Sequence, residues 1–376
     1  MKTIGIGFVG YGWISRAHAH ALHTLGHLDP TPRPIRLVGI AGRRREPLEA
    51  TARELGFERW TTDWEELVDD PDVDVVATLT AAEGHAEPTI AALERGKAVL
   101  CEKPLATGLG EARAMLAAAE ESGATTATGF NYRYVPAVAL ARELIAAGRL
   151  GALRQYRALY LQDYQVMGGQ PRSSGGAGAV LDYSHVVDML RFLAGEPQAV
   201  SARTASFVSD RDDAFAAILD LPGGATATLE ASRVALGWKG RQRVEVTGAD
   251  GALWWDMEDP NRLHVFLRED ATDGLGGFRD VLVTEPGHPH LARWWPPGHV
   301  LGWDASFVHQ WRDFLDAVLE DRPVPPRQAS FEDGFRAAVL CEAILTSARE
   351  GRRIEIDECI DAVHGGRETT TTKGTA

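Results

Sequence analysis

Short apolar runs alternate with amphipathic stretches along the first 130 residues. Five apolar runs have the length of buried strands: 3–9, 35–41, 74–79, 98–102 and 125–129. Five other stretches have the composition and spacing of helices: 15–25, 47–55, 64–68, 87–95 and 111–122. Strands that alternate with helices pair in parallel through right-handed crossovers. The pattern therefore predicts a doubly wound parallel sheet, an α/β domain that spans residues 1–130.

The pattern changes after Pro136, where helices no longer separate the strands. A helix at 138–147, a strand at 152–164 and a helix at 180–193 come first. Strand-like segments then follow one another with only turns between them: 199–208, 214–219, 225–233, 241–247, 251–256 and 263–267. Two closing helices are expected at 305–320 and 331–350. The pattern predicts an α+β domain at residues 131–358, built on a largely antiparallel open sheet, and a partly disordered tail at 359–376.

Composition and charge restrict the classes of function. The chain has 376 residues, of which 44% are hydrophobic and 24% are charged, as in an ordinary soluble protein. A formal net charge of -14 repels phosphate backbones and disfavours nucleic-acid binding as a main role. No apolar run approaches the ~18 residues of a membrane span, and the N-terminus lacks the pattern of a secretory signal. Three scattered cysteines predict neither disulfides nor a zinc site, so we expect a cytoplasmic protein without a metal.

A glycine loop at the first strand–helix junction has the spacing of a dinucleotide-binding turn. Gly10 and Gly12 follow the first strand, and Ser15 takes the place of a third glycine. Gly10 allows the tight turn, and Gly12 lets the backbone approach a pyrophosphate. The N–H groups of Trp13 and Ile14 then point at the anion from the helix N-terminus. The alternative is a glycine turn that holds no ligand.

The end of the second strand bears on which dinucleotide binds. An acidic residue at this place normally accepts the ribose 2′-hydroxyl of NAD. Here Gly42 is followed by Arg43, Arg44 and Arg45, with no acid. Guanidinium groups suit a 2′-phosphate, so the sequence predicts NADP in preference to NAD. The alternative is that these arginines stack on adenine or lie in solvent.

Lys103 follows the fourth predicted strand of the first domain. In open α/β sheets, ligands bind outside the carboxyl ends of the strands, so this lysine lies at the ligand-binding edge. A partly desolvated lysine beside a cationic nicotinamide has a lowered pKa and can exchange a proton near neutrality. Taken alone, a lysine after a strand is more often a solvated charge.

Asp182, His185 and Asp188 follow one another at spacings of three in the predicted helix at 180–193. Residues three apart are neighbours on one helix face, so each carboxylate can reach the imidazole. A carboxylate orients an imidazole and raises its basicity, which makes His185 a candidate general base for an alcohol proton. The alternative is a helix cap at Asp182 with an incidental histidine.

Three segments, taken together, resemble the glucose–fructose oxidoreductase/inositol dehydrogenase/MocA (Gfo/Idh/MocA) oxidoreductase family. They are GYGWISRAH at 10–18, AALERGKAVLCEKPL at 91–105 and GFNYRYVPA at 129–137. The resemblance covers about residues 3 to 356. It implies an N-terminal Rossmann domain and a C-terminal α+β domain whose open sheet often mediates oligomers, so we expect a homodimer or homotetramer. It also implies oxidation or reduction of ring hydroxyls of sugars and cyclitols with NAD(H) or NADP(H).

The resemblance further implies roles for single residues. Lys103 matches the catalytic lysine, His185 the proton acceptor and Asp182 the nearby aspartate. The implied dinucleotide contacts, besides the glycine loop and Gly42, Arg43 and Arg44, are Leu79, Thr80, His85, Glu102, Lys103 and Asn131. The aspartate precedes the histidine by three residues here and by four in many members, which leaves open whether Asp182 or Asp188 supports His185. Ala81 also stands where the family usually has proline.

We hypothesise that a secondary alcohol binds between the two domains, with its hydroxyl on Lys103 and His185. Proton removal by His185, shared with Lys103, then accompanies hydride transfer to nicotinamide C4. Further candidates for substrate contact are Arg133, Tyr160, Asp163 and Trp295, of which Trp295 suits a core or a subunit interface equally well. The substrate stays open among pyranoses, anhydrosugars and inositols. Two other functions stay open as well: NAD-dependent redox-assisted glycoside cleavage and non-catalytic regulation by dinucleotide binding.

Overall fold

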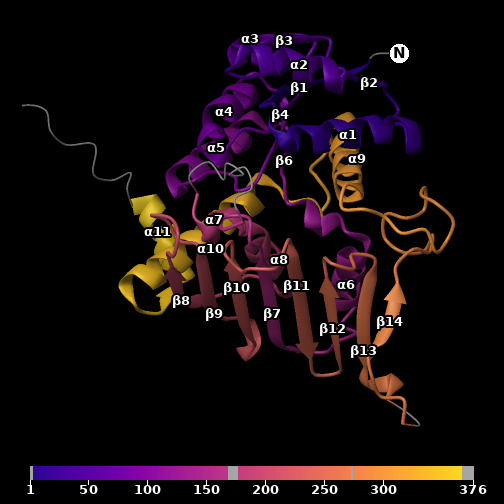
Figure 1. The fold of residues 1–376 in the computed structure, drawn as a ribbon, viewed down its shortest axis with the longest axis vertical. Coiled ribbons are helices and arrows are strands. Elements are labelled where there is room, and N and C mark those ends of the chain that lie inside the picture. Colours follow the sequence, from indigo (N-terminus) through magenta and orange to yellow (C-terminus); the bar gives the residue numbers. More distant parts are fainter. Residues whose placement is uncertain (1–2, 168–176, 272–273, 366–376) are drawn as a thin grey trace, which may run out of the picture.

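Two stacked units, each built on one β-sheet, make up the molecule (Figure 1). The computed structural model describes residues 3–167, 177–271 and 274–365. The first 130 residues form the upper unit in Figure 1, and the larger sheet lies below it. The tail expected from residue 359 begins inside a helix, α11 (Ile356–Gly365), and its remainder lies outside the described residues.

The upper sheet is parallel throughout, with the strand order β3-β2-β1-β4-β5-β6. Its strands are β1 (Ile4–Val9), β2 (Ile35–Ala41), β3 (Arg59–Thr61), β4 (Val75–Thr78), β5 (Ala98–Cys101) and β6 (Thr126–Thr128). The helices between them are α1 (Trp13–Leu28), α2 (Arg45–Leu55), α3 (Trp64–Asp69), α4 (Ala86–Glu94) and α5 (Leu109–Ser122). This confirms the predicted doubly wound α/β fold. The prediction omitted β3, because its three partly exposed residues are too few to show a period.

The lower sheet is antiparallel except where β7 and β10 pair in parallel, with the strand order β14-β13-β12-β11-β7-β10-β9-β8-β15. Its strands are β7 (Leu153–Leu161), β8 (Ala199–Ala205), β9 (Ala214–Asp220), β10 (Thr226–Ser232), β11 (Arg241–Gly248), β12 (Gly251–Asp256), β13 (Arg262–Leu267), β14 (Arg279–Leu282) and β15 (Ile354–Glu355). The predicted open, largely antiparallel sheet is confirmed. The two edge strands β14 and β15 escaped prediction because each is short.

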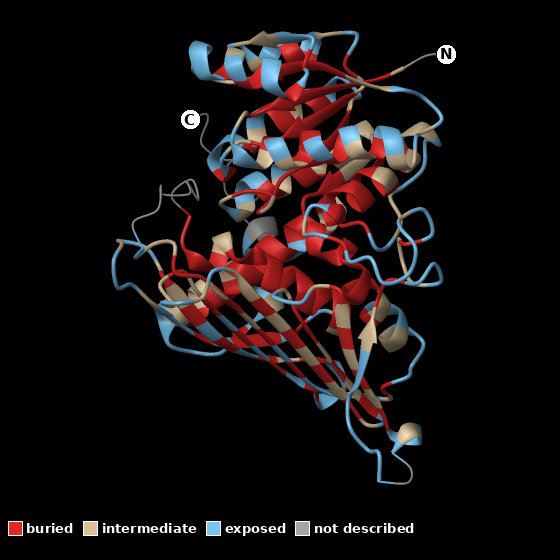
Figure 2. Cartoon of the chain, turned by 45° about the vertical axis from the view of Figure 1, so that its right-hand side comes forward, coloured by how far each residue is buried: buried red, intermediate tan, exposed pale blue. Residues whose placement is uncertain are grey.

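Helices cover one face of this sheet and leave the other face open. The covering helices are α6 (Pro136–Ala146), α7 (Ala179–Asp182), α8 (Ser184–Ala194) and α10 (Phe331–Glu350). On β10, buried alanine and leucine side chains alternate with exposed polar ones, and Figure 2 shows the same banding along neighbouring strands. The period of two places the apolar set of each strand under the helices. No helix in the described part of the chain is long and apolar enough to cross a membrane.

Helix α9 (Ala305–Leu319) comes after the lower sheet in the sequence but packs on the upper unit. It lies beside α1 (Figure 1). Its Phe307, Trp311 and Phe314 share one hydrophobic core with Ile6 and Phe8 of β1. The core of the upper unit is therefore completed by a helix from the range 131–358, which the sequence pattern had assigned wholly to the second domain.

Candidate active site

A cavity of about 380 Å³ lies between the two units, at the carboxyl ends of β4 and β5. The upper unit contributes Trp13, Ile14, Thr80, Ala81, Glu102 and Lys103. The rest of the chain contributes Asn131, Tyr132, Tyr160, Gln162, Tyr164, Asp182, His185, Met257 and Trp303, among others. A larger hollow of about 630 Å³ opens on the uncovered face of the lower sheet, but none of the predicted site residues that the structure describes lines it. The predicted chemistry therefore belongs to the smaller cavity.

Lys103 and Asp182 meet in this cavity. The Lys103 ammonium donates a hydrogen bond of 2.7 Å to the backbone oxygen of Asp182 and lies 3.7 Å from its carboxylate Oδ1. The Tyr164 hydroxyl donates to the other carboxylate oxygen, Oδ2, at 2.5 Å. Burial raises the pKa of Tyr164, and the carboxylate raises it further, so this hydroxyl stays a donor. Asp182 thus holds the lysine from one side and is itself held by a tyrosine.

His185 lines the same cavity but has no carboxylate support within the described residues. The helix predicted over 180–193 is broken at Tyr183, so Asp182 ends α7 while His185 belongs to α8. The imidazole lies edge-on to the rings of Tyr132 and Phe130, at centroid distances of 4.5 Å and 5.9 Å. Burial, followed by the charge of Lys103, lowers the pKa of His185 well below its usual value. The predicted rise in basicity has no carboxylate behind it among the described residues, and a lowered pKa favours the neutral ring.

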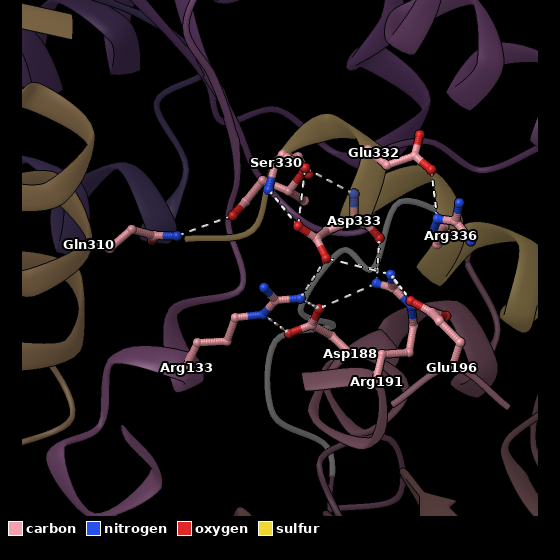
Figure 3. Close-up of polar contacts among 10 residues, drawn as sticks. Arg133, Asp188, Arg191, Glu196, Gln310, Ser330, Glu332, Asp333 and Arg336 are labelled. Atoms are coloured by element: carbon pink, nitrogen blue, oxygen red, sulfur yellow. Dashed lines mark hydrogen bonds and ion pairs between the residues drawn. The ribbon is translucent and has the colours of Figure 1, made fainter. Parts of the chain in front are cut away.

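Arg133 and Asp188 form a buried ion pair (Figure 3), and neither residue lines the cavity. The guanidinium donates to both carboxylate oxygens of Asp188, at 2.8 Å and 2.5 Å, and to Oδ1 of Asp333 at 3.1 Å. Arg191 joins the cluster by donating to the backbone oxygen of Asp333 at 2.8 Å. Arg133 therefore does not line the cavity in which we expected it to contact the substrate, and its charge is paired inside the protein. Asp188 is likewise not the partner of His185.

Asp163 and Trp295 also lie outside the cavity. The Asp163 carboxylate accepts hydrogen bonds from the Lys239 ammonium at 2.5 Å and from the Gly237 N–H at 3.1 Å, and the Lys239 bond lowers the pKa of that carboxyl. Trp295 is 54% exposed and makes an edge contact with Trp294. Neither residue lines the cavity in which we expected it to contact the substrate.

The glycine loop has the shape that a pyrophosphate needs. Gly10 has a φ of 117°, and a Cβ there would lie 2.5 Å from the backbone oxygen of Leu79, so a side chain is excluded. A Cβ on Gly12 would meet open space, and no side chain in the described chain caps helix α1 at this residue. The Thr80 hydroxyl is buried nearby without a hydrogen-bond partner among the described residues. The loop and helix end therefore fit a dinucleotide phosphate, and the Thr80 hydroxyl is a polar group available to a ligand bound in the cavity.

Two of the other residues that the resemblance implies as dinucleotide contacts, His85 and Leu79, do not line the cavity. His85 is buried, with its ring nitrogens 3.0 Å from the Pro104 oxygen and 3.1 Å from the Thr80 oxygen, and burial lowers its pKa. The His85 ring therefore links the segment after β4, at Thr80, to the segment after β5 that contains Lys103 and Pro104. Leu79 is buried against Gly10. By contrast, Asn131 lines the cavity, and its amide donates to the Ser306 hydroxyl at 2.8 Å.

The arginines after β2 are only partly available for a 2′-phosphate. Arg44 precedes α2 and donates to the Tyr11 hydroxyl at 3.2 Å. The Arg45 guanidinium lies over the ring of Trp60 at 5.2 Å. Gly42 leaves the space that the Tyr11 ring fills, because a Cβ there would lie 2.1 Å from that ring. The argument for NADP therefore depends mainly on Arg43.

Comparison with known proteins identifies the relatives of this arrangement. The oxidoreductase family with an NAD-binding Rossmann fold matches residues 4–130, and the Gfo/Idh/MocA C-terminal domain matches residues 138–254. A levoglucosan dehydrogenase from Pseudarthrobacter phenanthrenivorans is 33% identical, over 95% of this chain and 99% of its own length. The chain belongs to the Gfo/Idh/MocA oxidoreductase family.

Other members of the Gfo/Idh/MocA family are similar over nearly the whole chain. An inositol 2-dehydrogenase from Rhizobium meliloti is 27% identical, over 94% of this chain and 99% of its own. The solved structure of levoglucosan dehydrogenase in complex with NADH and levoglucosan has a TM-score of 0.89 and 34% identity, covering 94% of this chain and 99% of that one. An oxidoreductase domain protein from Kribbella flavida has a TM-score of 0.90 and 39% identity, covering 95% of this chain and 100% of its own. The chain is therefore an NAD-binding member of a family of sugar and cyclitol dehydrogenases.

Of the four further candidates for substrate contact, only Tyr160 lines the cavity. Gln162 lines it as well and was missed, although a period of two along β7 and its extension places Tyr160, Gln162 and Tyr164 on one face. That period was a usable signal, and it separates Gln162 from Asp163. Trp303 offered no such signal, because tertiary packing places its ring over Trp13 at a centroid distance of 6.0 Å.

Proposed function

We propose that this protein is an NAD(H)-dependent dehydrogenase that acts on a ring secondary hydroxyl of a sugar or cyclitol. The observation that carries the proposal is the meeting of Lys103, Asp182 and His185 in one cavity beside the glycine loop. The similarity to levoglucosan dehydrogenase makes an anhydrosugar in the pyranose form the first substrate to test. The tyrosine hydroxyls, the Gln162 amide and the Trp303 ring give the cavity both polar groups and an aromatic face for a sugar.

The proposed mechanism divides the proton chemistry between two side chains. When bound, the nicotinamide supplies the hydride acceptor or donor at its C4. The Lys103 ammonium, held by Asp182, donates a hydrogen bond to the substrate oxygen and stabilises the negative charge that develops there. The neutral His185 ring accepts the hydroxyl proton as the O–H bond breaks. Because burial disfavours the charged imidazole, His185 returns the proton readily when the reaction runs toward the alcohol.

NAD(H) is proposed in place of the NADP expected from the three arginines. Arg44 and Arg45 have partners within the protein, and the similar levoglucosan dehydrogenase structures hold NADH. Titrating the protein with NADH and with NADPH, and following the quenching of tryptophan fluorescence, tests this choice. Tighter binding of NADPH, abolished by Arg43→Ala, would restore the original expectation.

Replacing Lys103 with alanine tests the mechanism. We expect kcat to fall by about 10²- to 10⁴-fold, because the substrate oxygen loses its charged donor. The Kd for NADH should change by less than about threefold, since the glycine loop is intact. Formation of reduced nicotinamide is followed by its absorbance, with levoglucosan, inositols and unmodified pyranoses as substrates. Lys239→Ala is the matched control, because this lysine is exposed and does not line the cavity.

The same assay separates the proposal from the other functions. Near-normal turnover by the Lys103→Ala variant would reject the role of this lysine. Release of an aglycone from a glycoside without net formation of reduced nicotinamide would indicate redox-assisted cleavage instead. Silence with every substrate, together with tight dinucleotide binding, would favour a regulator.

A further inference from the structure

A chain of buried hydrogen bonds lies behind Lys103 and plays no part in the proposed mechanism. The Trp311 indole N–H donates to Nδ1 of His18 at 2.9 Å. Nε2 of His18 lies 3.1 Å from Oε1 of Glu102. The second carboxylate oxygen, Oε2, accepts the backbone N–H of Lys103 at 2.9 Å. The chain therefore runs from α9 through α1 to the backbone of the lysine itself.

The chemistry of the groups fixes the direction of these bonds. An indole nitrogen is a donor only, so Nδ1 of His18 must accept and carries no hydrogen. Nε2 is then the nitrogen that bears the hydrogen, and it donates to Glu102. The imidazole is fully buried, with the rings of Phe307 and Trp311 edge-on at 5.0 Å and 5.8 Å. The ring cannot turn away without losing both bonds and these contacts.

The Glu102 carboxylate sits in a tight slot at the cavity wall. Glu102 is 6% exposed, and each of its oxygens has one of the partners described above. A Cβ on Gly129 would lie 2.8 Å from Oε1, so only glycine leaves room for the carboxylate. A buried carboxylate that loses a donor is strongly destabilised in place and moves or changes its protonation state. The position of the Lys103 backbone therefore depends on the donor at His18.

We propose that His18 is a positioning residue that acts on Lys103 through Glu102. His18 fixes the carboxylate, the carboxylate fixes the Lys103 backbone, and Asp182 holds the ammonium from the front. Because Trp311 belongs to α9, a helix of the second half of the chain sets the donor nitrogen of His18. This inference rests on the proposed function, since it assumes that Lys103 acts on the substrate.

Two amide variants at His18 form a matched pair for the test. The amide nitrogen of Gln reaches the place of Nε2, whereas that of Asn reaches only the place of Nδ1. Asn can also place its amide oxygen at the position of Nδ1 and keep the bond from the Trp311 N–H, whereas Gln leaves that N–H without its acceptor. The two variants therefore keep opposite ends of the chain, and only His18→Gln keeps the donor to Glu102. We expect kcat of His18→Asn to fall by about 10²-fold, the loss typical of a small misplacement of a reacting group, and His18→Gln to stay within about fivefold of the unchanged protein. KM and the Kd for NADH should change by less than about threefold in both.

Hydrogen–deuterium exchange of the dinucleotide-free protein supplies a readout that does not depend on turnover. The Lys103 N–H is protected by Glu102, so the peptide that spans residues 98–105 should exchange faster in His18→Asn and remain protected in His18→Gln. Equal loss of kcat in the two variants, or unchanged protection of this peptide in His18→Asn, would overturn the proposal. Failure of the proposed function looks different, because the unchanged protein would then form no reduced nicotinamide, or Lys103→Ala would keep its turnover, while the exchange of the 98–105 peptide in the His18 variants would still report the hydrogen-bond chain.

Discussion

Replacing Arg133 with methionine tests whether this residue serves the architecture or the substrate. Asp188 faces the guanidinium at 2.5 Å, and its side chain is 3% exposed. Its other cationic neighbour, Arg191, lies 3.9 Å away. The variant therefore leaves a carboxylate buried with one distant partner, while methionine keeps most of the volume of the side chain.

The expected cost follows from this burial. Removing one member of a buried ion pair destabilises a protein by about 3–5 kcal/mol, because the remaining charge stays desolvated. For a unit of the size of the second domain, that cost lowers Tm by about 10 °C. Arg336→Met is the matched control, since Arg336 forms an exposed pair with Glu332 beside the same cluster (Figure 3) and should cost less than about 1 kcal/mol.

Thermal unfolding followed by circular dichroism measures the loss, and steady-state kinetics at 25 °C measures the function. The double variant Arg133→Met, Asp188→Leu removes both charges and should regain most of the lost Tm. KM for the sugar should stay within about threefold of its original value, because Arg133 does not line the cavity. A raised KM with an unchanged Tm would refute the reasoning and return Arg133 to the substrate.

Two further predictions concern the glycine loop and the buried histidines. Gly10→Ala should lower Tm, because its Cβ would meet the Leu79 oxygen. Gly12→Ala should keep Tm, because its Cβ meets open space, and should weaken NADH binding in a fluorescence titration. Equal effects of the two variants on Tm and on NADH binding would contradict these different roles. Burial lowers the pKa of His290 to about 2 and that of His309 to about 4, against about 6.5 when unfolded. The unfolded chain therefore binds more protons below pH 6.5, and by pH 5 each histidine should remove about 2 kcal/mol of stability. Between pH 7.5 and pH 5, Tm should fall less steeply in His290→Asn than in the unchanged protein. Asparagine is chosen because it tolerates the positive φ of 65° at this position. An unchanged slope would count against the lowered pKa of His290.

The sequence was sufficient for the fold class and for the ligand-binding edge of the upper sheet. Alternating strands and helices give a parallel sheet whose carboxyl ends must share one edge, and this places Lys103 near the loop of Gly10 and Gly12. The partners of the charged side chains were not predictable in this way. Arg133 pairs with Asp333, two hundred residues further along the chain, and no local pattern reports such a contact.

The helix of Asp182 and His185 shows a second limit. The residue types around them favour one continuous helix, and the spacing of three is then an argument for contact. The break at Tyr183 separates the two side chains and gives the carboxylate to Lys103. A break of one residue changes which groups meet, yet it leaves almost no trace in composition or periodicity.

The packing of α9 on the upper unit affects both the folding of the chain during synthesis and the choice of cut sites for truncations and chimeras. At about 5–20 residues per second, roughly 10–40 s separate the synthesis of residue 130 from that of residue 319. During that interval α9 does not yet exist, so the face of β1 that bears Phe8 lacks the aromatic side chains of α9 that pack on it. The hydrophobic core of the nucleotide-binding half is therefore incomplete while the rest of the chain is translated. A truncation or chimera cut at residue 130 would leave the same apolar surface bare. Any exchange of this half between relatives therefore has to carry residues 305–319 with it.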